Sequence, residues 1–113
     1  IVVKDAKILI LGITFKENCP DVRNTKVVDI YHTLSEYTNN IDVYDPWANA
    51  ERVEHEYGIS IKTQLPDEMY DAVILAVAHN EFRDIDFSAI RANNSVLYDV
   101  KGVLSRDIID GRL

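Results

Sequence analysis

The feature that most constrains the fold is a short, uninterrupted apolar run, Ile8 to Leu11, which ends at Gly12. A short run that is apolar at every position is typical of a strand buried on both faces of a parallel sheet. The loop that follows, residues 12–25, carries charges of both signs and leads into an amphipathic segment. Because ligands of open α/β sheets bind outside the carboxyl ends of the strands, we expect a site at this loop. Its single glycine does not match a dinucleotide fingerprint, which needs three.

Strand-like and helix-like segments alternate along the rest of the chain. We predict strands at residues 6–12, 41–45, 72–78 and 95–99, an extended piece at 59–62, and helices at 24–38, 48–57 and 86–92. Residues 102–113 are ambiguous. The alternation predicts βαβ units, and therefore a single domain of the α/β class over residues 1–113. We expect a three-layer, Rossmann-like, mainly parallel sheet with helices on both faces and the first strand away from the sheet edges.

Composition narrows the functions open to this chain. Its 113 residues are 47% hydrophobic and carry a formal net charge of −7. This acidity argues against nucleic acid as a partner, because a phosphate backbone needs a basic surface. A small phosphorylated ligand needs only a local pair of cations. The single cysteine, Cys19, cannot form an internal disulfide, which suits a reducing cytoplasm.

Nothing in the sequence predicts a membrane segment. No stretch approaches the roughly 20 apolar residues of a membrane span. Because the chain opens directly on a predicted strand, we expect no signal peptide. The chain does not begin with Met. We therefore expect it to be a piece of a longer protein.

Polar residues follow each predicted strand. Lys16 and Arg23 come after the first strand, and Lys101 comes after the fourth. In a parallel sheet these carboxyl ends share one edge, so the three cations predict an anion-binding edge on an acidic domain. A structural interpretation stays open for each of them: Arg23 can pair with Asp21, and the two lysines can be solvated surface side chains.

Three further residues have more ordinary interpretations than catalysis. His79 follows the third strand, and a structural role is favoured because the sequence shows no Ser, Cys or carboxylate partner near it. Cys19 lies in the loop with Lys16 and Arg23, whose charges would favour a thiolate, but we interpret it as a bystander thiol. Trp47 is expected to pack over the sheet edge. The three histidines lack the spacing of metal ligands, so we expect no metal site.

The segment GITFKENCPDVRNT, residues 12–25, resembles the opening of the carboxyl-terminal domain in the UDP-glucose/GDP-mannose dehydrogenase family. The family pattern G-x-x-[FY]-K-x-[ND]-x-x-D-x-R-x-[ST] is matched by Gly12, Phe15, Lys16, Asn18, Asp21, Arg23 and Thr25. Three further segments occur in the family's order: VYDPW at 43–47, AVILAVAHNEF at 72–82 and LYDVKGVL at 97–104. The combination is most similar to the branch that acts on UDP-N-acetylhexosamines in capsule and O-antigen pathways.

The resemblance implies that the chain is one of three parts of a larger enzyme. Family members combine an amino-terminal Rossmann domain that binds NAD, a central helical domain, and this nucleotide-sugar-binding carboxyl-terminal domain. The implied reaction is a four-electron oxidation of a UDP-sugar at C6, from alcohol to carboxylate, with two NAD molecules. The catalytic cysteine and the glycine-rich cofactor loop belong to the other parts. The fragment alone is therefore expected to be inactive, and the full-length enzyme to be cytoplasmic and homo-oligomeric.

Site residues carry over by their position in the motif. The lysine of the FK pair is a substrate contact in the family, so the resemblance implies that Lys16 binds the UDP-sugar, together with Phe15 at the strand exit. The motif arginine lies on the cofactor side, which implies that Arg23 contacts NAD. After the last core strand the family often has an arginine against the nucleotide sugar. Lys101 stands in that position here and lacks the bidentate fork. Asp21 is expected to position the loop.

A different class of function stays open from the sequence. The chain could instead be a free-standing nucleotide- or phosphate-binding module, or a regulatory domain without redox activity. The parent gene upstream of Ile1 discriminates between the two readings. A dehydrogenase requires a G-x-G-x-x-G strand–turn–helix and a cysteine-bearing central region there.

Overall fold

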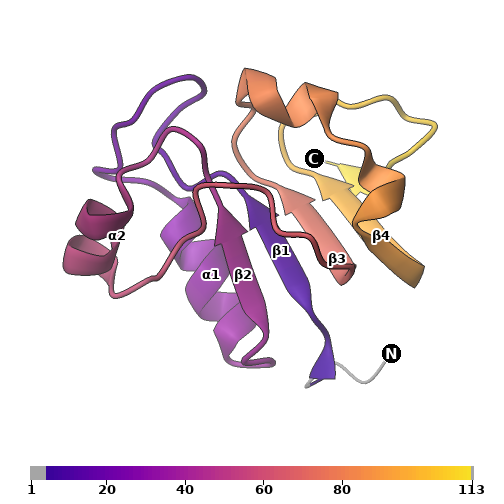
Figure 1. The fold of residues 1–113 in the computed structure, drawn as a ribbon, viewed down its shortest axis with the longest axis horizontal. Helices are drawn as coiled ribbons and strands as arrows, with labels where there is room; N and C mark the ends of the chain where they lie inside the picture. The colour runs from indigo at the N-terminus through magenta and orange to yellow at the C-terminus, as the bar shows by residue number, and fades with distance from the viewer. Residues whose placement is uncertain (1–4, 113) are drawn as a thin grey trace.

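The chain folds around a five-stranded sheet in which the strands pair in parallel (Figure 1). The computed structural model describes residues 5–112. The strands are β1 (Ile8–Leu11), β2 (Ile41–Tyr44), β3 (Tyr70–Leu75), β4 (Arg91–Asp99) and β5 (Gly111–Arg112), in the spatial order β2-β1-β3-β4-β5. β1 lies inside the sheet, between β2 and β3, as predicted. The carboxyl ends of the strands face the upper side of Figure 1, where the loops that follow them gather.

The apolar run of β1 explains the layers, because alternate residues of a strand point to opposite faces. Ile8 and Ile10 belong to one core cluster, whereas Leu9 and Leu11 belong to another on the opposite face. All four side chains are buried. A strand of this kind must be packed on both faces, which excludes a sheet with one solvent-exposed face.

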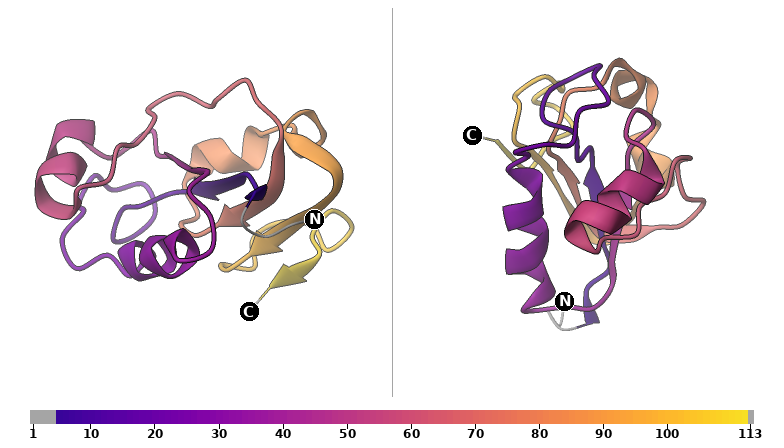
Figure 2. Two further views of the ribbon diagram at one scale, coloured as in Figure 1. Left: turned by 90° about the horizontal axis from the view of Figure 1, so that it is seen from below. Right: turned by 90° about the vertical axis from the view of Figure 1, so that its left-hand side faces the viewer.

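The two faces are covered by different kinds of helix (Figure 2). Helix α1 (Val27–Ser35) packs on the face of Ile8 and Ile10, and helix α2 (Ala50–Tyr57) lies past the β2 edge and adds Val53 to the same cluster. The 3-10 helices η2 (Asn80–Asp84) and η3 (Phe87–Ala89) cover the face of Leu9 and Leu11. The predicted three-layer, Rossmann-like α/β fold is confirmed, with 3-10 helices in place of α-helices on the second face.

The two α-helices begin and end at residues with specific backbone roles. α1 is shorter than the predicted 24–38, since Asn24 has a φ of 58°, which a helix does not allow, and Thr25 Oγ1 accepts from the Val27 N–H at 3.2 Å. In α2 the Asn49 side chain caps the first turn by accepting from a backbone N–H. Gly58, with a φ of 69°, ends that helix in a left-handed cap.

The third strand ends earlier than predicted. Its predicted range, 72–78, is replaced by 70–75, because the N–H groups of Ala76 and Val77 both donate to the Leu11 carbonyl, at 2.9 and 3.2 Å, and turn the chain across the end of β1. This crossing also explains the glycine at the end of β1. Gly12 has a φ of +95°, and a Cβ there would lie 2.6 Å from the Val77 Cβ.

The predicted helix at 86–92 is wrong over most of its length. Only Phe87–Ala89 is helical, as the single 3-10 turn η3, and β4 already starts at Arg91 instead of residue 95. The buried pair Phe87 and Ile90 has a spacing of three, which suits a 3-10 turn as well as an α-helix. β4 then bulges, because Tyr70 pairs with Arg91 but Ala72 pairs with Val96.

The remaining differences concern short elements. The extended piece at 59–62 makes one parallel bridge, between Lys62 and Tyr44, and is not a full strand. η2 is absent from the sequence prediction. Within the ambiguous tail, β5 pairs with β4 and packs Gly111 against the Tyr98 ring, while Leu113 lies outside the described residues.

Candidate functional site

The carboxyl ends of three adjacent strands converge on one buried polar cluster. Thr14 follows β1, Asp45 follows β2 and His79 follows β3, and all three side chains are buried. His79 Nε2 lies 2.9 Å from Asp45 Oδ2 and 3.1 Å from Thr14 Oγ1. On the other side of the ring, the Asn18 backbone N–H donates to His79 Nδ1 at 2.9 Å. The imidazole therefore links three strand ends and the loop after β1.

These contacts define the donor and acceptor roles of the two His79 nitrogens. Because the Asn18 N–H donates to Nδ1, that nitrogen carries no proton and acts as the acceptor. The proton is on Nε2, which donates to the Asp45 carboxylate and faces the Thr14 hydroxyl oxygen. Thr14 uses its own proton to donate to the Lys16 carbonyl at 2.9 Å. The two ring nitrogens of His79 therefore have different roles, with Nδ1 as acceptor and Nε2 as donor.

Asp45 organises the backbone around this cluster. Its Oδ2 accepts from the N–H groups of Ile13 (2.7 Å) and Thr14 (3.3 Å) as well as from His79, and its Oδ1 accepts from the N–H groups of Trp47 (2.7 Å) and Ala48 (2.9 Å). Burial acts to raise the pKa of Asp45. The hydrogen bonds from His79 and from the backbone outweigh burial, and the pKa is lowered below its ordinary value. The carboxylate is thus held ionised.

The loop that leaves this cluster presents the FK pair to solvent. Phe15 has 55% of its surface exposed, and Lys16 is exposed beside it. The loop is closed at its base, where the Phe15 N–H donates to the Asp21 carbonyl at 2.7 Å. The two residues predicted from the motif therefore lie at the rim of the sheet's carboxyl edge, where the sequence places the site.

A small pocket of about 140 Å³ lies at the same edge, between the loops after β1, β3 and β4 and the start of α1. It is lined by Thr14, Phe15, Thr25, Lys26, Val27, Ile30, Ala76, Val77, Val100 and Lys101. Two predicted residues, Phe15 and Lys101, therefore come together, while Lys16 is not among the lining residues. Sequence reasoning missed Lys26, although its place directly before α1 puts it at the same edge.

Lys101 is positioned by a buried carboxylate. Asp99 Oδ1 accepts from the N–H groups of Lys101 (2.9 Å) and Gly102 (2.8 Å), and Oδ2 accepts from the Leu104 N–H (2.7 Å). The side chain of Asp99 thus folds the loop after β4, and the Lys101 side chain is exposed on it.

Arg23 forms the ion pair that the sequence leaves open. Its Nε and Nη2 donate to the two carboxylate oxygens of Asp21, at 3.0 and 3.1 Å. These hydrogen bonds lower the pKa of Asp21 to about 2. The Arg23 side chain is 72% exposed. The Asp21 side chain therefore positions Arg23 at the surface.

His79 and Trp47 have the structural roles predicted for them, although His79 has a carboxylate partner that was not predicted. The His79 ring is fully buried and hydrogen-bonded at both nitrogens, as suits a structural histidine, but the expectation that no carboxylate lies near it is wrong because Asp45 contacts it. The Trp47 ring stacks on His79 with ring centroids 6.1 Å apart and donates from its Nε1 to Glu81 at 3.0 Å, which confirms its packing over the sheet edge. Cys19 is a partly buried free thiol.

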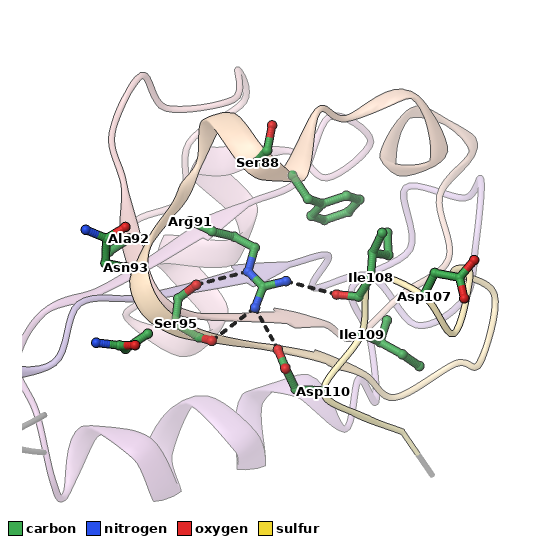
Figure 3. Close-up of a pocket in the computed structure, with 11 residues that line it drawn as sticks. Ser88, Arg91, Ala92, Asn93, Ser95, Asp107, Ile108, Ile109 and Asp110 are labelled. Carbon is green, nitrogen blue, oxygen red and sulfur yellow. Dashed lines mark hydrogen bonds and ion pairs between the residues drawn. The ribbon is translucent and has the colours of Figure 1, made fainter.

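A larger hollow lies elsewhere, at the amino end of β4 (Figure 3), and has a volume of about 580 Å³. Its one arginine, Arg91, is held by internal contacts. Arg91 donates to Ser95 Oγ (3.0 Å), to the Ile108 carbonyl (2.9 Å) and to Asp110 (2.7 Å). With Asp107 also in the lining, this hollow is poorly suited to a phosphate.

Residues 5–112 contain no group of three His, Cys, Asp or Glu side chains that could hold a metal ion. In the same part of the chain, none of the helices combines the length and the apolar character needed to cross a membrane.

Comparison with known sequences gives an independent assignment. A family model described as "UDP-glucose/GDP-mannose dehydrogenase family, UDP binding domain" matches residues 9–106. Over 98% of its length the chain is 50% identical to the UDP-N-acetyl-D-glucosamine 6-dehydrogenase of Pseudomonas aeruginosa and 44% identical to that of Salmonella typhi. It spans 27% of the length of each of these relatives.

Solved structures agree on the fold. A UDP-D-ManNAc dehydrogenase from Pyrococcus horikoshii superposes with a TM-score of 0.74 at 18% identity, covering 99% of this chain and 26% of that one. A UDP-glucose dehydrogenase from Pyrobaculum islandicum gives a TM-score of 0.68 at 25% identity, over 85% of this chain and 22% of that one. With the family model covering the chain from β1 to the loop after β4, this protein belongs to the UDP-glucose/GDP-mannose dehydrogenase family, where it corresponds to the UDP binding domain and is most similar to the UDP-N-acetylhexosamine branch.

Proposed function

We propose that this chain is the UDP-sugar-binding, carboxyl-terminal domain of an NAD-dependent dehydrogenase that oxidises C6 of a UDP-N-acetylhexosamine to a carboxylate. The observation that carries the proposal is the match of residues 9–106 to a UDP binding domain, together with the two 6-dehydrogenase relatives. The product would be a UDP-uronate for capsule or O-antigen synthesis. Because the chain spans about a quarter of its relatives, the rest of the enzyme would supply the chemistry.

Phe15, Lys16 and Lys101 form the substrate wall in this proposal. Their placement at the carboxyl edge supports it, since the two lysines bring positive charge to an acidic chain at the edge where α/β folds bind ligands. Lys26, which shares the pocket with Phe15 and Lys101, joins them as a candidate phosphate contact. The exposed Phe15 ring offers an apolar face for the sugar or the base.

Arg23 is the proposed NAD contact. Its hydrogen bonds to Asp21 use Nε and Nη2, so the Nη1 donors stay available to an anion. NAD itself would bind mainly to a domain outside this chain, because no dinucleotide fingerprint occurs in the sequence. The other domains of the same polypeptide would be direct partners, and a cytoplasmic homo-oligomer is the form we propose for the complete enzyme.

The test is the activity of the complete polypeptide and of this chain alone. The complete protein should reduce NAD with a UDP-N-acetylhexosamine as substrate, and the 113-residue chain should produce no NADH, because catalysis needs nucleophile, cofactor and substrate in register. A complete protein without UDP-sugar-dependent NAD reduction would contradict the proposal. A parent gene that lacks a dinucleotide-binding segment would instead favour the free-standing binding or regulatory module.

A further inference from the structure

The FK pair lies in a short inner loop, residues 14–18, whose two ends are anchored by one imidazole ring. His79 Nε2 lies 3.1 Å from the Thr14 hydroxyl at the start of the loop, and His79 Nδ1 accepts from the Asn18 backbone N–H at its far end. Between these two anchor points are Phe15, Lys16 and Glu17, which are all exposed. The ring therefore spans the base of a short loop whose tip contains two of the proposed substrate contacts.

Contacts of Asp45 and of the Asn18 side chain hold the His79 ring and the end of the loop in one orientation. Asp45 accepts a hydrogen bond from the Nε2–H group, so the lone pair of Nδ1 is presented to the Asn18 N–H. Asn18 has a φ of 53°, and its side chain accepts from the Asn80 N–H at 2.9 Å, which ties the same loop end to the residue after His79. Within the described residues every buried side-chain polar atom has a partner. The loop shape is thus determined by a complete hydrogen-bond network.

The same contacts argue against acid–base chemistry by His79. The ring has no exposed surface, and both nitrogens are engaged within the chain. A general acid or base needs a nitrogen within hydrogen-bond distance of the substrate. What the ring can do is hold backbone geometry.

From this arrangement we propose that His79 is a positioning residue for UDP-sugar binding: by bridging Thr14 and Asn18 it holds Phe15 and Lys16 in the conformation that meets the nucleotide sugar. The inference rests on the proposed function of this edge. Rigid presentation increases affinity because the loop loses less conformational freedom when the ligand binds. His79 is therefore expected to act on the UDP-sugar and to have little effect on NAD.

Two substitutions of His79 test the roles of its two ring nitrogens separately. In His79→Asn the amide oxygen can replace Nδ1 as the acceptor for Asn18, while the contact with Asp45 is lost. In His79→Gln the amide nitrogen can replace Nε2 as the donor to Asp45, while the loop end is released. Asn18→Ala leaves the core intact and removes the loop's side-chain bond to Asn80. The measurements, on the complete enzyme, are KM for UDP-N-acetylglucosamine and for NAD, and hydrogen exchange of peptides covering residues 14–18.

In His79→Gln we expect exchange in the loop to rise about tenfold and KM for the UDP-sugar to rise by a similar factor, as for loss of one buried hydrogen bond. KM for NAD should stay within about twofold of the wild-type value. In His79→Asn, which keeps an acceptor for the Asn18 N–H, the increases in loop exchange and in KM for the UDP-sugar should be much smaller than in His79→Gln. If His79→Gln does not fold, Asn18→Ala should still raise both loop exchange and the KM for the UDP-sugar.

Faster loop exchange in either variant with an unchanged KM for the UDP-sugar would overturn the inference. Equal increases of KM for both substrates would do the same, because a general loss of structure is not selective. A wild-type enzyme without UDP-sugar-dependent activity would refute the proposed function instead, and the exchange rates would then report separately whether His79 anchors the loop.

Discussion

Substitution of Asp45 by Asn should destabilise the protein far more than loss of one charge at a surface would. The Asp45 side chain is fully buried and accepts five hydrogen bonds, three at Oδ2 and two at Oδ1. An Asn amide has only one acceptor oxygen. If that oxygen faces Ile13, Thr14 and His79, the amide NH₂ group faces two backbone N–H donors, and the reverse orientation leaves three donors unpaired.

A buried donor without a partner costs about 1–3 kcal/mol. Two such donors, and weaker bonds to a neutral acceptor in place of a carboxylate, predict a loss of about 3–5 kcal/mol in the free energy of unfolding. Such a loss is a large fraction of the roughly 5–15 kcal/mol available to a domain. It corresponds to a decrease in Tm of roughly 10–20 °C. Chemical denaturation followed by circular dichroism measures the free energy directly.

Asp99→Asn is the matched comparison, because Asp99 is equally buried but accepts two bonds at one oxygen and only one at the other. It should lose about 1–3 kcal/mol. Asp84→Asn, at an exposed position, should change stability by less than about 0.5 kcal/mol. If Asp45→Asn costs less than about 1 kcal/mol, or no more than Asp99→Asn, the account of the cluster is wrong.

The stability difference between the wild type and Asp45→Asn should also depend on pH, in a direction that the pKa of Asp45 determines. Because the pKa of Asp45 is lowered on folding, its contribution is fully present above the unfolded value of about 3.9 and is lost as the pH falls through the lower folded value. The stability difference between the wild type and Asp45→Asn should therefore be constant near neutral pH and shrink below about pH 4. A difference that grows on acidification would contradict this sign.

Three further predictions concern single residues. Gly12→Ala should cost about 2–4 kcal/mol in unfolding experiments, since it combines a positive φ with a Cβ 2.6 Å from another side chain, whereas Gly58→Ala, with open space around it, should cost about 1 kcal/mol. In steady-state kinetics of the complete enzyme, Lys16→Ala should lower kcat/KM for the UDP-sugar roughly 10–100-fold with little effect on NAD, and Arg23→Ala should act mainly on NAD; unchanged constants for Lys16→Ala would remove it from the site. An NMR titration should give Asp21 a pKa of about 2, which rises towards its ordinary value in Arg23→Ala.

Hydrophobic pattern and motif spacing were sufficient for the fold and for placing the motif residues at the carboxyl edge of the sheet. The run from Ile8 to Leu11 predicts a strand covered on both faces, and the glycine after it marks the end of that strand. The close crossing of Val77 over Gly12 is seen only in the structure. The boundaries of β3 and the 3-10 character of residues 87–89 were not predictable in this way. They depend on tertiary contacts, such as the N–H groups of Ala76 and Val77 turning towards Leu11, that leave no local signal.

The contact between His79 and Asp45 could not be predicted from the sequence. Asp45 ends the predicted strand 41–45 and His79 follows the predicted strand 72–78, so the pattern places both at the same edge, but contact between them depends on the strand order. β2 and β3 flank β1, and the residues after them reach across its carboxyl end to meet at Thr14. With the order β2-β1-β3 unknown, His79 had no visible partner. Lys26 was missed for a similar reason, since the pocket that it lines needs the loop after β4.

The central place of β1 has a consequence for the order of events in folding. Ile8 pairs with Ile41 on one side and with Ala72 on the other, so β1, the first of these five strands along the chain, has both edges paired only after two later segments have been synthesised. Non-local parallel pairing of this kind slows folding. The chain loses entropy when the intervening loop closes, and the contacts that compensate for this loss form only afterwards. Until β3 has been synthesised and has paired, one edge of the apolar strand β1 is exposed and can associate with other chains. A nascent polypeptide stalled shortly after residue 60 should therefore depend on chaperones more strongly than one stalled beyond β4.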